Sequence, residues 1–142
     1  MKTFVFVVLL LFTSALILPI CGCVSESESH YNAGVELHEQ GRWEEAIAEY
    51  NKAIKLDPNL AIAYNNRAAA YFETGRYDLA IADFNKAIEL DPNLAMAYAN
   101  RALAYTVLGM DTEAEQDVEI AVQLGIDREF LEGMVEQVKQ MR

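Results

Sequence analysis

The amino-acid sequence predicts an all-α fold, an α-solenoid built from helix pairs that stack side by side. The first observation is an internal period of 34 residues: Asp57-Pro58-Asn59-Leu60-Ala61 returns as Asp91-Pro92-Asn93-Leu94-Ala95. The second is that glycine follows the same period, at positions 41, 75 and 109. The third is that the segments between these glycines carry apolar residues at helical spacing. A fixed period of this length indicates a repeat architecture, in which each unit covers the apolar face of its neighbour.

The composition is that of a folded, acidic protein. The chain has 142 residues, of which 53% are apolar and 23% are charged, enough for one domain and too few for two separate cores. Residues 24–142 carry all 22 acidic residues and 10 of the 11 basic ones, a net charge of −12. The sequence has no basic stripe to displace counterions from phosphates, so we expect no binding to nucleic acid.

The first 23 residues are predicted to be a targeting segment outside the fold. Lys2 is its one charge, and an uncharged, mostly apolar run follows from 4 to 20, as in a secretory signal peptide. The run ends in Ile20-Cys21-Gly22-Cys23, which resembles the bacterial lipobox. That resemblance implies a signal peptide over 1–22, a lipidated Cys23 as the mature N-terminus, and a short tether over 23–26.

Two other interpretations of this segment stay open. As a helix, residues 4–24 would be about 31 Å long at about 1.5 Å per residue, enough for an uncleaved membrane anchor. The other interpretation is that the segment is cleaved and the protein is secreted without an anchor. All three place the rest of the chain outside the cytoplasmic membrane, and the first two anchor it to the cell membrane. No cysteine follows Cys23, so we expect no disulfide framework and no cysteine nucleophile in the folded part.

The middle unit shows why each helix begins and ends where it does. From 60 to 74 the chain has no glycine or proline and is rich in alanine, a strong helix former. Gly75 ends this helix, and a second one is predicted from 77 to 90. Asp91 precedes Pro92, which disfavours helical backbone at Asp91 and so ends the second helix. We expect the same Asp91 to cap the next helix, with Pro92 as its first residue.

These units resemble the tetratricopeptide repeat, a helix–turn–helix unit of the same length. The middle unit carries the family's signature residues at Tyr64, Ala68, Tyr71, Ala80, Phe84, Ala87 and Pro92. The resemblance implies three repeats, at 27–60, 61–94 and 95–128. It also implies the family's architecture, an α-solenoid in which the first helices of successive repeats line a concave surface.

The two ends of the array depart from the repeat pattern. Ser25 and Glu28 fit a capping box, which predicts that the first helix begins just after Ser25. Gly125 is placed to end the last helix of the third repeat, and Asp127 to cap one more helix over 129–142. We interpret this helix, apolar on one side, as a cap on the last repeat. The alternative is that its apolar side binds a membrane or a partner helix.

No motif predicts catalysis, a cofactor or a metal. The two histidines, His30 and His38, lack the His-Glu-x-x-His spacing of a zinc site. The serines between 25 and 29 have no base arranged to activate them. The glycines are spaced as turns rather than as a phosphate-binding loop. We therefore expect no enzyme and no cofactor, and a function in protein–protein interaction.

The resemblance implies a peptide-binding groove on the concave surface. The implied site residues are Tyr31, Asn32, Ile62, Asn65, Asn66, Phe72, Met96, Asn100 and Leu103. One position of each repeat is always asparagine, at 32, 66 and 100, and an amide can both donate to and accept from the main chain of an extended peptide. The alternative is that these asparagines bond only to neighbouring helices.

The family's best-known site, the carboxylate clamp for chaperone C-termini, does not carry over. Of its five positions only Asn66 matches. The other four hold Tyr31, Val35, Met96 and Asn100 in place of Lys, Asn, Lys and Arg, respectively. Glutamates at 28, 39 and 73 flank the predicted groove, and lysine is absent from it. We therefore expect a partner segment that is apolar and neutral or basic.

These expectations combine into one function and one alternative. The protein is predicted to be tethered outside the cell membrane and to hold a peptide segment of a partner protein in its groove. The alternative is a structural or assembly subunit of an envelope complex, which acts through self-association as a homo-oligomer or through its convex surface.

Overall fold

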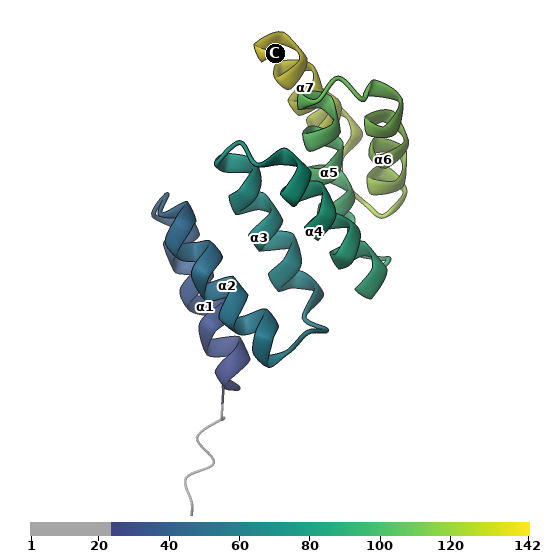
Figure 1. The fold of residues 1–142 in the computed structure, drawn as a ribbon. Coiled ribbons are helices and arrows are strands. Elements are labelled where there is room, and N and C mark those ends of the chain that lie inside the picture. The colour runs from purple at the N-terminus through teal and green to yellow at the C-terminus, as the bar shows by residue number, and fades with distance from the viewer. Residues whose placement is uncertain (1–23) are drawn as a thin grey trace, which may run out of the picture.

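The computed structural model describes residues 24–142, which form seven helices (Figure 1). They are α1 (Glu26–Glu39), α2 (Trp43–Leu56), α3 (Ala61–Glu73), α4 (Tyr77–Leu90), α5 (Ala95–Val107), α6 (Asp111–Gln123) and α7 (Arg128–Met141). The predicted signal peptide over 1–22 and the predicted lipidation of Cys23 lie outside the described residues. Within 24–142, every helix is too short or too polar to cross a bilayer.

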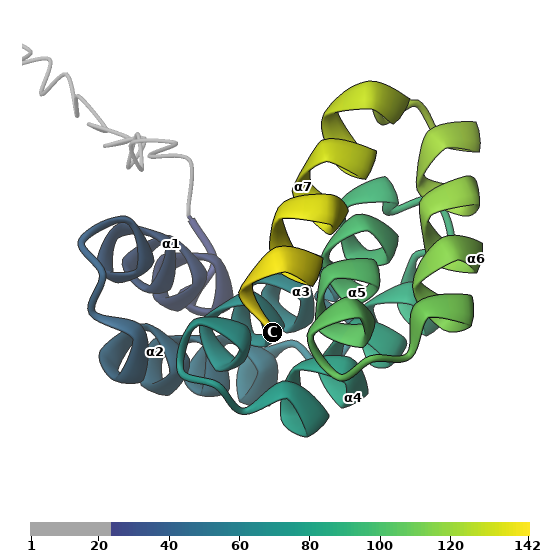
Figure 2. The same cartoon turned by 90° about the horizontal axis from the view of Figure 1, so that it is seen from above.

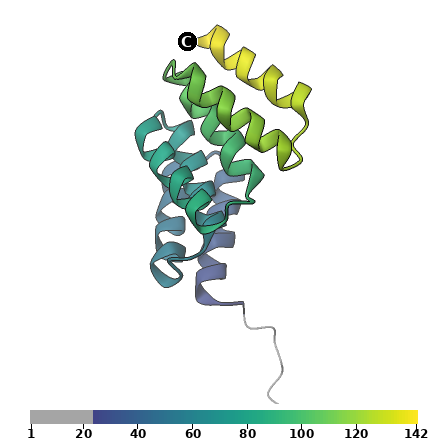
Figure 3. The ribbon, with the colours of Figure 1, turned by 90° about the vertical axis from the view of Figure 1, so that its right-hand side faces the viewer.

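The helices are arranged as three consecutive pairs, α1 with α2, α3 with α4 and α5 with α6, followed by α7. Each pair stacks on the next, so the array grows in one direction from the first pair to α7 (Figures 1 and 3). The second helix of each pair packs against the first helix of the following pair. The predicted all-α solenoid of helix pairs is thereby confirmed.

Glycine makes the turn inside each pair. Gly41, Gly75 and Gly109 have φ of +73°, +74° and +75°, a backbone region that glycine enters without steric cost. At the first turn the N–H of Gly41 donates to the His38 carbonyl, and the N–H of Arg42 donates to the Leu37 carbonyl, each at 2.9 Å. These bonds satisfy carbonyls that the end of α1 would otherwise leave unpaired.

The connections between pairs differ from the sequence prediction. Asp91 does not cap α5, and Pro92 is not its first residue, because α5 begins at Ala95 with Leu94 as its N-cap. Asp91 instead uses its carboxylate to accept the N–H of Asn93 at 3.0 Å, which holds a turn. Pro92 and Asn93, which the sequence predicted to begin the helix, therefore lie in this turn instead.

The caps at the two ends of the array are as predicted. The Ser25 hydroxyl accepts the N–H of Glu28 at 3.1 Å at the start of α1. The Asp127 carboxylate accepts the N–H of Phe130 at 2.8 Å at the start of α7. Gly125, with φ of +106°, ends the preceding segment in the left-handed conformation expected of a helix stop.

The core lies between the helices of each pair and continues under α7. Ala68, Ala80, Phe84 and Ala104 form one cluster, and their small side chains let the helices approach closely around the fully buried Phe84 ring. A second cluster joins α5 and α6 to α7 through Leu131, which is 1% exposed. Both clusters lie within residues 24–142, so this part of the chain contains its own core.

Candidate functional site

The first helices of the three pairs and α7 surround a concave surface. In Figure 2, α1 lies on one side and α5 with α6 on the other, and the yellow α7 lies beside α5 on the side that faces α1. Three adjoining hollows lie along this surface, and we call them together the groove. The α1–α3 hollow has a volume of 430 Å³, the middle hollow 160 Å³, and the α5–α7 cleft 330 Å³. Asn100 lines all three, so the three hollows adjoin one another at this residue.

Eight of the nine predicted site residues line the groove. Those in the α1–α3 hollow are Tyr31, Ile62, Asn65, Asn66, Met96 and Asn100. The middle hollow adds Phe72 and Leu103, and Leu103 also lines the α5–α7 cleft with Met96 and Asn100.

Asn32 is the exception, because it is exposed and lines none of the three hollows. Asn66 donates to Tyr31, and Asn100 donates to Asn65, so each reaches the residue 35 positions earlier on the preceding first helix. Among residues 24–142, no helix precedes α1 and could offer Asn32 the equivalent bond.

The groove asparagines form a chain of side-chain hydrogen bonds from α1 to α5. The amide of Asn66 donates to the Tyr31 hydroxyl at 3.1 Å, the amide of Asn65 donates to the Asn66 oxygen at 3.0 Å, and the amide of Asn100 donates to the Asn65 oxygen at 3.5 Å. This is the cross-helix bonding that the sequence left open as an alternative. An amide has two N–H donors and an oxygen with two lone pairs, so each asparagine keeps capacity for a ligand.

Two buried polar atoms in the α1–α3 hollow lack a hydrogen-bond partner among the described residues: the Tyr50 hydroxyl and Nδ1 of His38. Burial raises the pKa of the Tyr50 phenol, which therefore stays protonated at neutral pH. Burial also lowers the pKa of His38, although the carboxylates of Glu73 and Glu39 oppose this, so the ring is neutral at pH 7. The His38 ring packs edge-on against Trp43, with ring centres 4.7 Å apart.

The charged side chains that line the groove are all acidic. Glu39 lines the α1–α3 hollow, Glu73 the middle hollow, and Asp127 the α5–α7 cleft. Neither lysine nor arginine lines any of the three hollows in the part of the chain that the structure describes. The groove therefore presents a negative rim around an apolar and amide-bearing floor.

The arginines beside the groove are engaged in the scaffold. Arg67 of α3 makes a bidentate pair with Asp83 of α4, at 2.6 and 2.7 Å, and also donates to the Asn51 oxygen of α2 at 2.6 Å. One repeat later, Arg101 pairs with Asp117, at 2.7 Å in both bonds. These clamps were not predicted from the sequence, although each member recurs at the 34-residue period.

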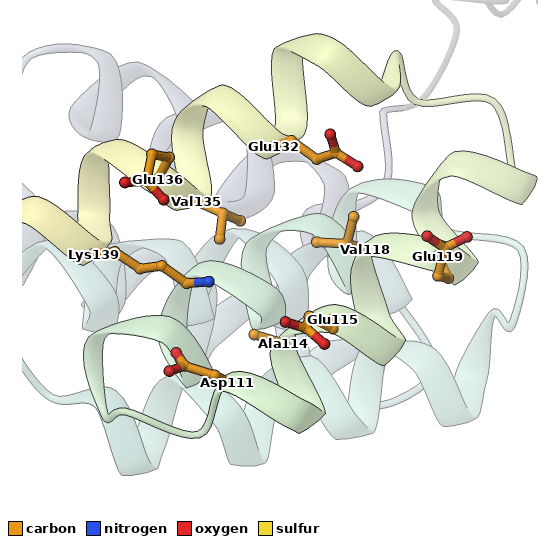
Figure 4. A pocket seen from close by; sticks show the side chains of 9 residues that line it. All are labelled: Asp111, Ala114, Glu115, Val118, Glu119, Glu132, Val135, Glu136 and Lys139. Atoms are coloured by element: carbon orange, nitrogen blue, oxygen red, sulfur yellow. The ribbon is translucent and has the colours of Figure 1, made fainter.

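A further hollow, of 520 Å³, lies between α6 and α7 outside the groove (Figure 4). Val118 and Val135 face each other across it, and carboxylates line its rim. Arg128 pairs with Glu119 at 2.6 Å, and Arg142 with Asp111 at 2.9 Å, which fixes α7 to α6 near both ends. The ion pairs at this rim therefore hold α7 against α6.

The side chains of residues 24–142 include no cluster of His, Asp or Glu that could hold a metal ion. His30 instead pairs with Glu49, with 2.6 Å between Nδ1 and the carboxylate oxygen.

Comparison with known families and structures gives consistent results. Family models described as "TPR repeat" and "Tetratricopeptide repeat" match residues 34–75, 61–94 and 84–116. A comparison with curated proteins finds no match. Among solved structures, the chain is similar to "TPR2B-domain:pHsp70-complex of yeast Sti1", with 31% identity and a TM-score of 0.73 over 82% of this chain and 98% of that one.

Two structures of RPAP3 domains are similar as well. "First TPR of Spaghetti (RPAP3) bound to HSP90 peptide SRMEEVD" has 28% identity and a TM-score of 0.74, and covers 81% of this chain and 91% of that one. The second TPR domain of human RPAP3 in complex with HSP70 peptide SGPTIEEVD has 32% identity and a TM-score of 0.71, over 80% and 94%. The chain belongs to the tetratricopeptide repeat family, whose repeats form a non-catalytic protein-interaction fold.

Proposed function

We propose that the protein binds an extended peptide segment of another protein in its groove. The observation that supports this most directly is that the three hollows adjoin at Asn100 and are lined by first helices from all three repeats together with α7. The similar domains of RPAP3 and Sti1 are described in complexes with chaperone peptides or a chaperone, which supports the same use of the surface here.

The preferred segment differs in charge from the peptides of these relatives. SRMEEVD and SGPTIEEVD end in acidic residues. The groove of this chain carries Glu39, Glu73 and Asp127 and no lining cation in the described part, so an acidic tail meets repulsion in a partly desolvated site. We therefore propose a segment that is apolar and neutral or basic.

The groove is long enough for a short peptide. First helices about 8–10 Å apart give a strip of roughly 25 Å. An extended chain advances about 3.3 Å per residue, so roughly seven residues fit along it. The asparagine chain would bond to the peptide main chain, and the apolar floor would receive alternate side chains.

We further propose that the protein works outside the cell membrane, tethered through a lipidated Cys23. This proposal rests on the sequence pattern of residues 1–23, in which Ile20-Cys21-Gly22-Cys23 follows an apolar run. An uncleaved helical anchor would give the same location with a different attachment.

The experiment that tests the groove proposal is selection from a displayed library of random heptapeptides against residues 24–142. Peptides that emerge are measured by fluorescence anisotropy beside SRMEEVD. We expect enriched peptides with apolar and basic side chains and at least tenfold weaker binding of SRMEEVD. Enrichment of acidic peptides, or binding of SRMEEVD as tight as that of the best selected peptide, would overturn the proposed preference. A library without any enriched peptide would contradict the function itself.

A further inference from the structure

We propose that the α5–α7 cleft is an anchor site for one bulky apolar side chain of the bound segment, a leucine, methionine or phenylalanine with a basic residue beside it. This inference rests on the proposed function and specifies which side chain the groove selects. It also gives α7 a second role besides the predicted cap on the last repeat.

The cleft has apolar walls from two helices. Met96 and Leu103 come from α5, and Phe130 and Met134 come from α7. Leu103 is buried and lies toward the floor, whereas Met96 is 50% exposed and Phe130 is 65% exposed. Two large apolar side chains from different helices are thus exposed to solvent along one cleft of 330 Å³. A side chain that enters between them would remove apolar surface of both from water.

The position of α7 creates this cleft. Toward the preceding pair, the first helices α3 and α5 pack mainly on its second helix, whereas α7 packs mainly on α5, the first helix of the pair before it. Leu131 and Val135 hold it there, in the core cluster that includes Leu103 and Val118. Because α7 lies over α5, its side chains at 130 and 134 form a wall of the groove.

Two of the residues that line the cleft are methionines. Met96 and Met134 have unbranched, polarisable side chains with several rotatable bonds, which fit ligand side chains of different shape. The cleft therefore accepts leucine, methionine or phenylalanine rather than a single residue type.

Charge determines which residues flank the anchor. Asp127 is the charged residue among those that line the cleft, and Glu73 lines the adjoining middle hollow. No cation lies on the cleft lining within residues 24–142, so a lysine or arginine next to the anchor is attracted and a glutamate is repelled. Asn100, which lines both the cleft and the α1–α3 hollow, is placed to bond the main chain beside the anchor.

The methionines make the proposal directly measurable by NMR. Residues 24–142 contain four: Met96 and Met134 in the cleft, and Met110 and Met141 outside it. All four are labelled with ¹³C at the ε-methyl group. The two methionines in the cleft then report binding there, and the two outside it report non-specific contact. The probes are the amidated, N-acetylated tripeptides Lys-Leu-Lys, Lys-Gly-Lys and Glu-Leu-Glu.

We expect Lys-Leu-Lys to shift the methyl signals of Met96 and Met134 saturably and to leave those of Met110 and Met141 in place. Lys-Gly-Lys should give no saturable shift, and Glu-Leu-Glu should bind at least fivefold more weakly. Phe130→Ala should weaken Lys-Leu-Lys binding about tenfold. Leu79→Ala, which removes a 49%-exposed apolar side chain from α4 outside the groove, should not change it.

Equal shifts at all four methionines, or equal binding of Lys-Leu-Lys and Glu-Leu-Glu, would overturn the anchor site. Its failure can be distinguished from failure of the proposed function by a heptapeptide from the library selection. If such a peptide binds the wild type and not N66A/N100A, while Lys-Leu-Lys leaves Met96 and Met134 unshifted, the groove binds peptides and the anchor site is wrong.

Discussion

Gly34 of α1 lies directly against the ring of Tyr50 of α2: a Cβ at position 34 would be 2.5 Å from Cε1 of Tyr50. In the next two repeats the position of Gly34 holds Ala68 and Ala102, and that of Tyr50 holds Phe84 and Val118. The first repeat thus combines the smallest residue on one helix with the largest on the other. From the second repeat to the first, the larger ring is thus matched by a smaller facing residue, whereas the third repeat pairs Ala102 with the smaller Val118.

Gly34→Ala should therefore destabilise the protein. The added methyl group meets the buried Tyr50 ring, and overpacking of this kind costs about 1–3 kcal/mol. Urea denaturation of residues 24–142 measures the change. The matched control is Gly133→Ala in α7, where a Cβ meets nothing and the helix gains roughly 0.5–1 kcal/mol. If both variants were stabilised alike, the close contact between Gly34 and Tyr50 would be wrong.

Asp117→Ala should cost far more than the loss of a surface ion pair. The substitution removes the carboxylate that pairs with the guanidinium of Arg101. This guanidinium would stay largely buried and without its ion-pair partner, since the Arg101 side chain is 16% exposed and that of Asp117 is 4% exposed. Breaking a buried pair in this way costs about 3–5 kcal/mol. Glu89→Ala, which removes the exposed partner of Lys86, should cost less than about 1 kcal/mol. Equal losses in the two variants would show that the Arg101–Asp117 pair does not hold α5 to α6.

Stability should fall on mild acidification because of His38. Burial lowers its pKa in the folded protein, so the unfolded chain binds the proton more readily. The stability that neutral His38 contributes is present above its unfolded pKa of about 6.5, and is lost as the pH falls through that value toward the lowered one. The free energy of unfolding should thus decrease from pH 7.5 to 5.5.

The variant His38→Gln should show a smaller decrease over the same range. The paired carboxylates of Glu49, Asp111 and Glu119 have lowered pKa values and lose their contribution only at more acidic pH, so they do not obscure the comparison. A decrease of the same size in His38→Gln would assign the pH dependence to another group.

Cys23→Ser should abolish lipid labelling and leave the leader uncleaved. The physical reason is that the thiol is the acceptor of the lipid in the pattern that Ile20-Cys21-Gly22-Cys23 resembles. Metabolic labelling with a radioactive fatty acid and mass spectrometry of the N-terminus check this, with Cys21→Ser as the matched control. Labelling that persists in Cys23→Ser, or an intact N-terminus in the mature wild type, would favour the uncleaved anchor.

The local features of this fold could be predicted from the sequence. The turns at Gly41, Gly75 and Gly109 need a positive φ, which glycine adopts most readily, so the residue type itself predicts them. The caps at Ser25 and Asp127 bond to backbone N–H groups three positions later, so a short stretch of sequence predicts them. The prediction for Asp91 was wrong because Asx turns and helix caps have similar local signals, and here the turn through Asn93 replaces the cap.

The parts of the groove that depend on packing between distant segments could not be predicted. Asn32 lies outside the groove, although Asn66 and Asn100 at the same repeat position line it. The contribution of Phe130 and Met134 follows from the packing of α7 on α5, which the amphipathic pattern of α7 does not specify. The Arg67–Asp83 pair joins residues 16 positions apart, and periodicity shows that they recur without showing that they touch.

The central claim is that the amide chain of the groove holds the bound peptide. Its most direct test is the affinity of the best selected heptapeptide for Asn66→Ala/Asn100→Ala, measured by fluorescence anisotropy. The double variant loses the proposed hydrogen bonds from the two amides to the peptide, worth about 1 kcal/mol each, so peptide affinity should fall at least tenfold. It should keep its helical circular dichroism, because within the protein the two amides donate only to the side chains of Tyr31 and Asn65. Asn32→Ala, at the same repeat position but outside the groove, should bind as the wild type does. A double variant that binds the peptide as tightly as the wild type would contradict the claim and place the contact on another surface.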